Sequence, residues 1–127
     1  MSMLPETRDA SYLWDMLDAA RAVRDFVSGR SYKDYRQDRM LRGAVERHIE
    51  IIGEAAGRVS KTFRDAHPEV PWQRIIAQRN VLVHEYGDIQ HDLMWKAATV
   101  HIPALVDTLE RLSPPISPEE DQGQSRS

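Results

Sequence analysis

Apolar residues recur along most of the chain at intervals of three and four positions, which is the spacing of one face of an α-helix. The first stripe follows Pro5, a residue suited to the first turn of a helix, and stops before Gly29. Its members are Leu13, Met16, Leu17, Ala20, Val23 and Val27. A longer stripe runs from Leu41 to Val59 and fades by Phe63. The two patterns predict two long amphipathic helices.

Polar and proline-containing connections separate the predicted helices. Ser31, followed three positions later by Asp34, resembles a helix-start signal in which an acid replaces the usual Glu or Gln, so this connection is predicted to be a loop or a short helical turn. Pro68 and Pro71 then break the helical pattern, and the second proline can occupy the first position of a new helix. We expect this third helix to extend to about Val83.

The last predicted helix begins between Asp88 and His91, after Gly87, and extends to Leu112. Pro103 lies inside it and removes one backbone donor, so we expect a kink or an interruption there. The chain shows neither strand-like alternation bounded by turns nor an internal repeat. The predicted fold is therefore all-α, an antiparallel bundle of four to five helices.

The helical pattern divides the chain into a body and a tail. Residues 1–112 are predicted to form one helical domain, because a single domain of this size can bury a core without metal or disulfide bonds. Residues 113–127 are rich in Pro, Ser and charged side chains and contain almost nothing apolar. We predict that they form a disordered tail.

Composition narrows the class of protein. The chain contains no Cys, so we predict no disulfide framework, no zinc–thiolate site and no thiol nucleophile. Its start lacks a basic segment followed by an apolar run, and no stretch approaches the roughly 18 apolar residues that a membrane span requires. We therefore expect a cytoplasmic protein without a membrane segment.

The net charge of the chain does not identify its binding partner. A formal net charge of −3 argues against a protein that binds nucleic acid over its whole surface. Residues 113–127, with three acids and one base, contribute −2 of this charge, which leaves −1 for residues 1–112. A nearly neutral body can still bind RNA in a local basic cleft, whereas strong, non-specific and salt-sensitive binding is not expected.

The candidate catalytic and binding residues lie on the third predicted helix. At about 100° of rotation per residue, Arg79 lies in the middle of an apolar stripe. The stripe consists of Trp72, Ile75, Ile76, Leu82 and Val83. Asn80 and His84 share a neighbouring face about 100 to 140° round from Arg79. The helix thus carries a guanidinium group on its packing side, with an amide and an imidazole beside it.

The guanidinium group of Arg79 cannot lose its proton, so placing it on a packing face is costly unless an anion compensates it. One candidate anion is an acid of the second helix, where Glu46, Glu50 and Glu54 follow one another in steps of four. The other candidate is a bound phosphate. Both can be present, because an acid can orient the guanidinium group while its remaining donors face the phosphate.

The combination of Arg79 and His84 suits one reaction in particular. An imidazole titrates near neutral pH, so it can remove a proton from a hydroxyl group. A fixed cation can stabilise the charge that develops on a phosphate. These are the two requirements for cleaving RNA through its own 2'-hydroxyl group, and neither requires a metal ion.

Other residues support more than one interpretation. Gly53 and Gly57 remove side-chain bulk from one face of the second helix, which indicates close approach by another helix, either of a second protomer or the first or fourth helix of this chain. His48 lies within the apolar stripe and is interpreted as a hydrogen-bonded core residue. A di-iron site usually requires Glu-x-x-His on two helices, a motif that the chain lacks; its nearest match, Asp88 to His91, is interpreted as a helix cap.

Three segments resemble those of HepT-like toxins, a branch of the HEPN superfamily. Residues 79–86, RNVLVHEY, followed by residues 88–89 and Trp95, resemble the family signature, in which Arg, a polar residue, spacers and His precede x-Tyr. Residues 47–55, RHIEIIGEA, resemble the second helix of the family, and residues 68–72, PEVPW, resemble the approach to its catalytic helix. The resemblance extends from the first helix to about residue 112.

This resemblance implies a HEPN-like homodimer in which Arg79 and His84 of both protomers face a shared cleft. It implies a metal-independent endoribonuclease without a cofactor, acting as the toxin of a type II toxin–antitoxin system. His84 would be the general base or acid, Arg79 would stabilise the scissile phosphate, and Asn80 would bind phosphate or hold the imidazole. The antitoxin would be a minimal nucleotidyltransferase that attaches nucleotide to Tyr86 and blocks the cleft.

Two other functions compete with this one. The chain could be a catalytically silent HEPN module that binds a nucleotidyltransferase or a nucleotide, or a purely structural helical dimer in which the surface from Arg79 to His84 is occluded. In either case Asn80 would cap or bridge its helix, and Tyr86 would be a packing residue with its hydroxyl group in water.

Overall fold

The apolar stripes of the sequence form the long helices of the computed structural model, which describes the backbone of residues 5–84 and 90–112 and the side chains of residues 8–79 and 90–112. The long helices are α1 (Pro5–Val27), α3 (Arg39–Arg58), α5 (Trp72–His84) and α7 (Ile102–Leu112). Shorter elements are α2 (Tyr32–Gln37), α4 (Lys61–Ala66), α6 (His91–Lys96) and the π-helical segment η1 (Ala97–His101). These ranges contain no β-strand, and the all-α prediction is confirmed.

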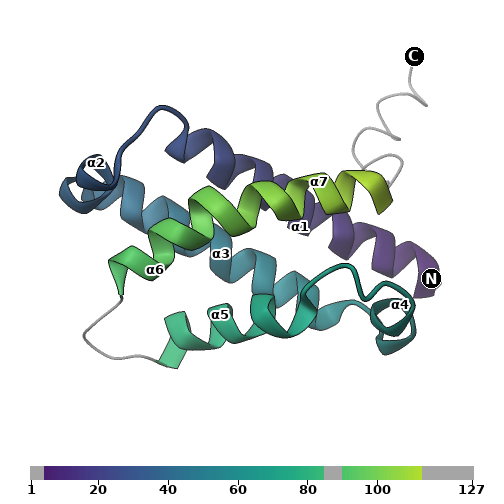
Figure 1. Ribbon diagram of the computed structural model, residues 1–127. Coiled ribbons are helices and arrows are strands. Elements are labelled where there is room, and N and C mark those ends of the chain that lie inside the picture. The colour runs from purple at the N-terminus through teal and green to yellow at the C-terminus, as the bar shows by residue number, and fades with distance from the viewer. Residues whose placement is uncertain (1–4, 85–89, 113–127) are drawn as a thin grey trace, which may run out of the picture.

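The long helices form an antiparallel bundle (Figure 1). α1 and α3 lie side by side, α5 packs on α3, and α7 packs on α1. Since α6, η1 and α7 follow one another without a break, they form one rod, and successive rods run in opposite directions. The core lies where α1, α3 and α7 meet, and its fully buried side chains include Met16, Ala20, Val23, Val45, Ala56, Val106 and Leu109.

Capping side chains define the starts of the short helices α2 and α4. Ser31 and Asp34 form the capping box that the sequence predicts, and the segment after them is the short helix α2. α3 ends at Arg58, and Ser60 then caps α4 by accepting a hydrogen bond from the backbone N–H of Phe63 (3.1 Å). The sequence pattern did not predict α4, because a six-residue helix is too short to show a stripe.

Asp9 of α1 fastens the start of α4 to the bundle. Asp9 is 8% exposed, and its carboxylate accepts hydrogen bonds from the backbone N–H (2.8 Å) and the hydroxyl group (2.6 Å) of Ser60. The hydroxyl group of Ser60 therefore serves both as a donor to Asp9 and as the cap of α4. One buried carboxylate thus joins elements that are 51 positions apart in the sequence.

The interruption expected at Pro103 takes the form of η1. The backbone N–H of Ile102 bonds to the carbonyl oxygen of Ala97, five positions earlier instead of four. Proline has no N–H, and its ring would clash with the carbonyl group four positions before it. The wider π-helical turn accommodates the ring, and the helix continues to Leu112.

Two further sequence predictions concern the absence of a membrane span and the C-terminal tail. Within residues 5–84 and 90–112, no helix combines the length and apolar character needed to span a bilayer. The predicted disordered tail, residues 113–127, lies outside the described residues.

Asp9→Ala leaves two donors of Ser60 without their acceptor, so we expect the free energy of unfolding to fall by about 1–3 kcal/mol. The matched control is Asp65→Ala, because Asp65 is exposed and its ion pair with Lys61 (2.7 Å) lies at the surface, where such pairs contribute at most about 1 kcal/mol. Urea denaturation measures both. Equal losses in the two variants would contradict the role of Asp9.

Candidate functional site

Trp72 fixes the start of α5. Its side chain is 7% exposed, and its indole N–H donates to the carbonyl oxygen of His67 (3.0 Å). Pro71 lies just before the helix instead of at its first position, and its carbonyl oxygen accepts a hydrogen bond from the backbone N–H of Ile75 (3.1 Å). α5 therefore begins one residue later than predicted and continues to His84.

α5 approaches α3 closely where Arg79 passes over Gly53. A Cβ atom built on Gly53 would lie 2.2 Å from the Cβ atom of Arg79 and 2.8 Å from its Cγ atom. At Gly57, a built Cβ atom meets nothing within 4 Å. The close approach predicted for these glycines thus occurs at Gly53 and comes from the third predicted helix of the same chain, which neither sequence-based alternative had named.

Gly53 belongs to the candidate site, although the sequence pattern did not connect it with Arg79. Its signal was present, because glycine in a helix interior costs about 1 kcal/mol relative to alanine and so indicates a steric reason. The sequence could not show that the reason is the stem of Arg79, since this contact joins residues on different helices. Gly53 acts as a positioning residue for the arginine.

The guanidinium group of Arg79 has no acid partner among the described residues. Arg79 is partly exposed, but its Nε atom is buried and makes no hydrogen bond to any described residue. Two acids of the α3 ladder are paired within their own helix: Glu50 lies 3.4 Å from Nη1 of Arg47, and Glu54 lies 3.1 Å from Nη2 of Arg58. The structure therefore does not bring these candidate acids to Arg79.

Glu46, the remaining acid of the ladder, faces α6. Burial raises the pKa of its carboxyl group, while the charges of His91 and Arg42 act in the opposite direction. Burial also raises the pKa of the neighbouring Tyr35, whose ring lies edge-on to that of His91 at 6.3 Å. Within the described part of the chain, neither the hydroxyl group of Tyr35 nor Nδ1 of His91 has a hydrogen-bond partner. Glu46 thus belongs to a buried polar cluster between α2, α3 and α6.

The other predicted site residues follow Arg79 along the chain. Asn80 and His84 lie on α5, which is α-helical up to His84, so the predicted rotation of about 140° between the backbone positions of Arg79 and His84 holds. The side chains of Asn80 and His84 lie outside the described residues, as does the whole of Tyr86. The roles of these three residues stay predictions.

His48 is the hydrogen-bonded histidine that the sequence predicts. Its Nδ1 atom donates to the carbonyl oxygen of Ala44 (2.7 Å), and its ring lies edge-on to that of Phe26 at 5.0 Å. Among side chains 8–79 and 90–112, no group of three or more His, Asp or Glu residues is placed to hold a metal ion.

The arrangement around Arg79 is suited to binding an anion. Its stem is held on Gly53, and no described acid neutralises its charge. A guanidinium group presents parallel N–H donors that match two oxygens of one phosphate or carboxylate. The side chain is partly exposed, so such an anion can reach it from solvent.

Comparison with known proteins places the chain among ribonuclease relatives. Residues 16–112 match the family described as "Ribonuclease HepT-like". A "Putative RNase" of Methanocaldococcus jannaschii is 35% identical over 100 residues, which are 79% of this chain and 92% of that protein. A "Probable ribonuclease HepT" of Thermococcus cleftensis is 33% identical over 101 residues, 80% of this chain and 92% of that protein. No solved structure gives a significant match.

Gly53→Ala places a methyl group where the stem of Arg79 lies, so we expect the free energy of unfolding to fall by about 1–3 kcal/mol, as in other overpacked sites. Gly57→Ala is the matched control, because its methyl group meets no atom and alanine favours the helix by up to about 1 kcal/mol. Thermal unfolding followed by circular dichroism measures both. Stabilisation by both substitutions would show that α5 does not depend on the contact.

Proposed function

Because the chain belongs to the HepT-like ribonuclease family, we propose that it is an endoribonuclease that cleaves RNA through attack by the 2'-hydroxyl group. The observation that supports this proposal is that Arg79 has no acid partner among the described residues. Its Nε atom is buried and has no hydrogen-bond partner among side chains 8–79 and 90–112, and Glu50 and Glu54 are paired elsewhere. A guanidinium group that has no acid partner and is partly exposed can donate hydrogen bonds to a phosphate through the N–H groups that face solvent.

The reaction that we propose proceeds in one displacement. His84, as general base, removes the proton of a 2'-hydroxyl group, and the oxygen attacks the adjacent phosphorus. The bond from phosphorus to the 5'-oxygen of the next nucleotide breaks, and this oxygen takes up a proton from a protonated imidazole. Arg79 stabilises the negative charge that grows on the non-bridging oxygens. The products are a 2',3'-cyclic phosphate and a 5'-hydroxyl end.

Asn80 completes the set of catalytic residues that we propose. Four positions separate it from His84, so the two lie about 40° apart on one face of α5. Its side-chain amide would donate to the phosphate or hold the imidazole in place. A base and a fixed cation meet the requirements of the reaction, so we propose that cleavage needs neither a metal ion nor another cofactor.

We propose that the active protein is a homodimer in which two α5 helices face a shared cleft. α5 lies at the edge of the bundle, where it packs on α3 (Figure 1). Its residues Gln73, Arg74 and Ala77 are exposed. An edge helix with an exposed face is available to a second protomer, which would bring a second Arg79 and His84 to the same phosphate.

We also propose that the protein is the toxin of a type II toxin–antitoxin system and that its antitoxin is a minimal nucleotidyltransferase. Tyr86 follows the end of α5 by two positions. Its oxygen would attack the α-phosphorus of a nucleoside triphosphate, and pyrophosphate would leave. The attached nucleotide would place bulk and negative charge close to Arg79 and compete with the phosphate of RNA.

Arg79→Ala and His84→Ala are each expected to slow RNA cleavage by about 10²–10⁴-fold, because each removes a group that acts in the transition state. Arg79→Lys keeps the charge without the planar fork, so we expect an intermediate rate. Arg58→Gln, which removes an exposed guanidinium group from α3, is the control and should cleave like the wild type.

Cleavage of a mixed pool of unmodified RNA measures these rates, and mass spectrometry identifies the cyclic phosphate ends. A wild-type rate in either alanine variant would refute the catalytic assignment. If the wild-type protein itself cut no RNA, the chain would be the catalytically silent module that binds a nucleotidyltransferase or a nucleotide.

Tyr86→Phe is expected to prevent modification of the chain by a co-expressed nucleotidyltransferase, because the acceptor oxygen is gone. Tyr12→Phe removes the hydroxyl group of a tyrosine on α1 and serves as the matched control, which should still be modified. Intact-mass spectrometry of the co-expressed pair measures the result. Addition of nucleotide to the Tyr86→Phe chain would place the acceptor at another residue.

A further inference from the structure

The segment that contains α2 carries an excess of positive charge. Residues 30–47 contain six basic and three acidic side chains, whereas the net charge of the whole chain is −3. The basic residues are Arg30, Lys33, Arg36, Arg39, Arg42 and Arg47. This local excess is the kind of basic surface that a chain of negative net charge would need in order to bind RNA.

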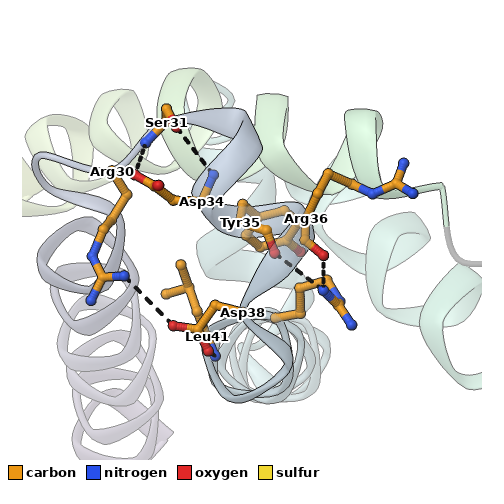
Figure 2. A network of polar contacts seen from close by, with 8 residues as sticks. Arg30, Ser31, Asp34, Tyr35, Arg36, Asp38 and Leu41 are labelled. Atoms are coloured by element: carbon orange, nitrogen blue, oxygen red, sulfur yellow. Dashed lines mark hydrogen bonds and ion pairs between the residues drawn. The ribbon is translucent and has the colours of Figure 1, made fainter.

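Two acids of this segment are occupied by helix caps (Figure 2). Asp34 accepts a hydrogen bond from the backbone N–H of Ser31 (2.9 Å), and this bond lowers the pKa of its carboxyl group. Asp38 accepts one from the backbone N–H of Leu41 (3.0 Å) and lies 3.6 Å from Arg30. Their carboxylates are turned into this network, as Figure 2 shows, and do not pair with the cations of α2.

Several cations therefore remain without an acid. Arg42 donates to the carbonyl oxygens of Tyr35 and Arg36 at the end of α2. Lys33, Arg36 and Arg39 are exposed, and none of them forms an ion pair within residues 8–79 and 90–112. Three charged groups thus face solvent on a short stretch of chain.

Aromatic rings border these cations. Tyr32 is 37% exposed, and its hydroxyl oxygen accepts a hydrogen bond from Nη1 of Arg36 (3.4 Å). The ring of Tyr32 lies 6.4 Å from that of Trp95 on α6, and Trp95 in turn lies 5.4 Å from the buried ring of Tyr35. The ring of Tyr35 therefore supports Trp95 from inside the bundle, while Tyr32 and Arg36 present flat groups to solvent.

We propose that Tyr32, Lys33, Arg36, Arg39 and Trp95, here called the α2 platform, bind unpaired nucleotides of the RNA substrate next to the cleavage site. The platform lies at the end of the bundle where α5 ends and α6 begins (Figure 1). Its cations suit phosphates, and its aromatic and guanidinium planes suit the faces of unpaired bases. This inference rests on the proposed ribonuclease function and adds that the substrate is single-stranded, since bases in a duplex cannot stack on side chains.

The test uses a fluorescent single-stranded RNA whose 2'-hydroxyl groups are all methylated, so that binding is measured without cleavage. Fluorescence anisotropy gives the Kd of the full-length protein at several salt concentrations. We expect Tyr32→Ala to weaken binding about 5- to 150-fold, the range for loss of one stacked base, and Tyr32→Phe to keep it within about twofold.

The contribution of the charged residues of the platform is measured by the salt dependence of RNA binding. Each of Lys33→Gln, Arg36→Gln and Arg39→Gln should reduce the salt dependence of binding by about 0.7 in the slope of log K against log salt concentration, the value for one phosphate contact on a single strand. Arg111→Gln, which changes an exposed arginine on α7 at the opposite end of the bundle, should leave Kd and slope as in the wild type.

Wild-type Kd and slope in all of the platform variants would overturn the inference and would leave this surface to a protein partner. Equal binding of a fully paired duplex would overturn it as well. Cleavage of unmodified RNA by the wild-type protein is measured separately. If the platform variants lose RNA binding and the wild-type protein cleaves no RNA, the platform is upheld and the ribonuclease function is rejected. If the wild-type protein cleaves RNA and the platform variants bind it unchanged, the ribonuclease function is upheld and the platform is rejected.

Discussion

The packing of Arg79 on Gly53 positions the cation on which the proposed function depends. α5 is attached to the bundle chiefly through α3, and an arginine stem can serve as an apolar packing surface while its charged end remains near water. Gly53 supplies the space for this stem, and Trp72 fixes where α5 begins. The same side chain thus joins two helices and presents a cation. A change at Gly53 acts on the position of the cation as well as on stability.

The placement of acids explains how a chain of net charge −3 can bind RNA. Glu50 and Glu54 form ion pairs within α3, and Asp34 and Asp38 cap helices. Each of these acids therefore interacts with residues close to it in the sequence. Arg79 is left without a described acid partner, and so is the α2 platform. Positive charge without an acid partner is therefore available at Arg79 and on the α2 platform, which favours local contacts with phosphate over binding across the whole surface.

Local information in the sequence was enough to predict most of the fold. The apolar stripes, Pro5 and the pair Ser31 and Asp34 all act within a few positions, and each forms the element expected. α4 was missed because a six-residue helix is too short to show a stripe, and the contact that holds its start, from Ser60 to Asp9, joins residues 51 positions apart. For the same reason the sequence identified Arg79 as a buried-side cation but not its contact with Gly53, nor that Glu46 faces His91. Contacts between distant residues depend on how the helices pack, which periodicity does not specify.

The state of the Arg79 guanidinium group can be observed directly by NMR, through the resonance of its Nε–H group. A single-stranded RNA with methylated 2'-hydroxyl groups is titrated into the protein, and Arg58, whose guanidinium group pairs with Glu54, is the internal reference. If Arg79 is the phosphate ligand, its resonance shifts and its exchange with water slows as the RNA binds, while that of Arg58 changes little. An Arg79 resonance that stays unchanged when the protein is saturated with RNA would contradict this role.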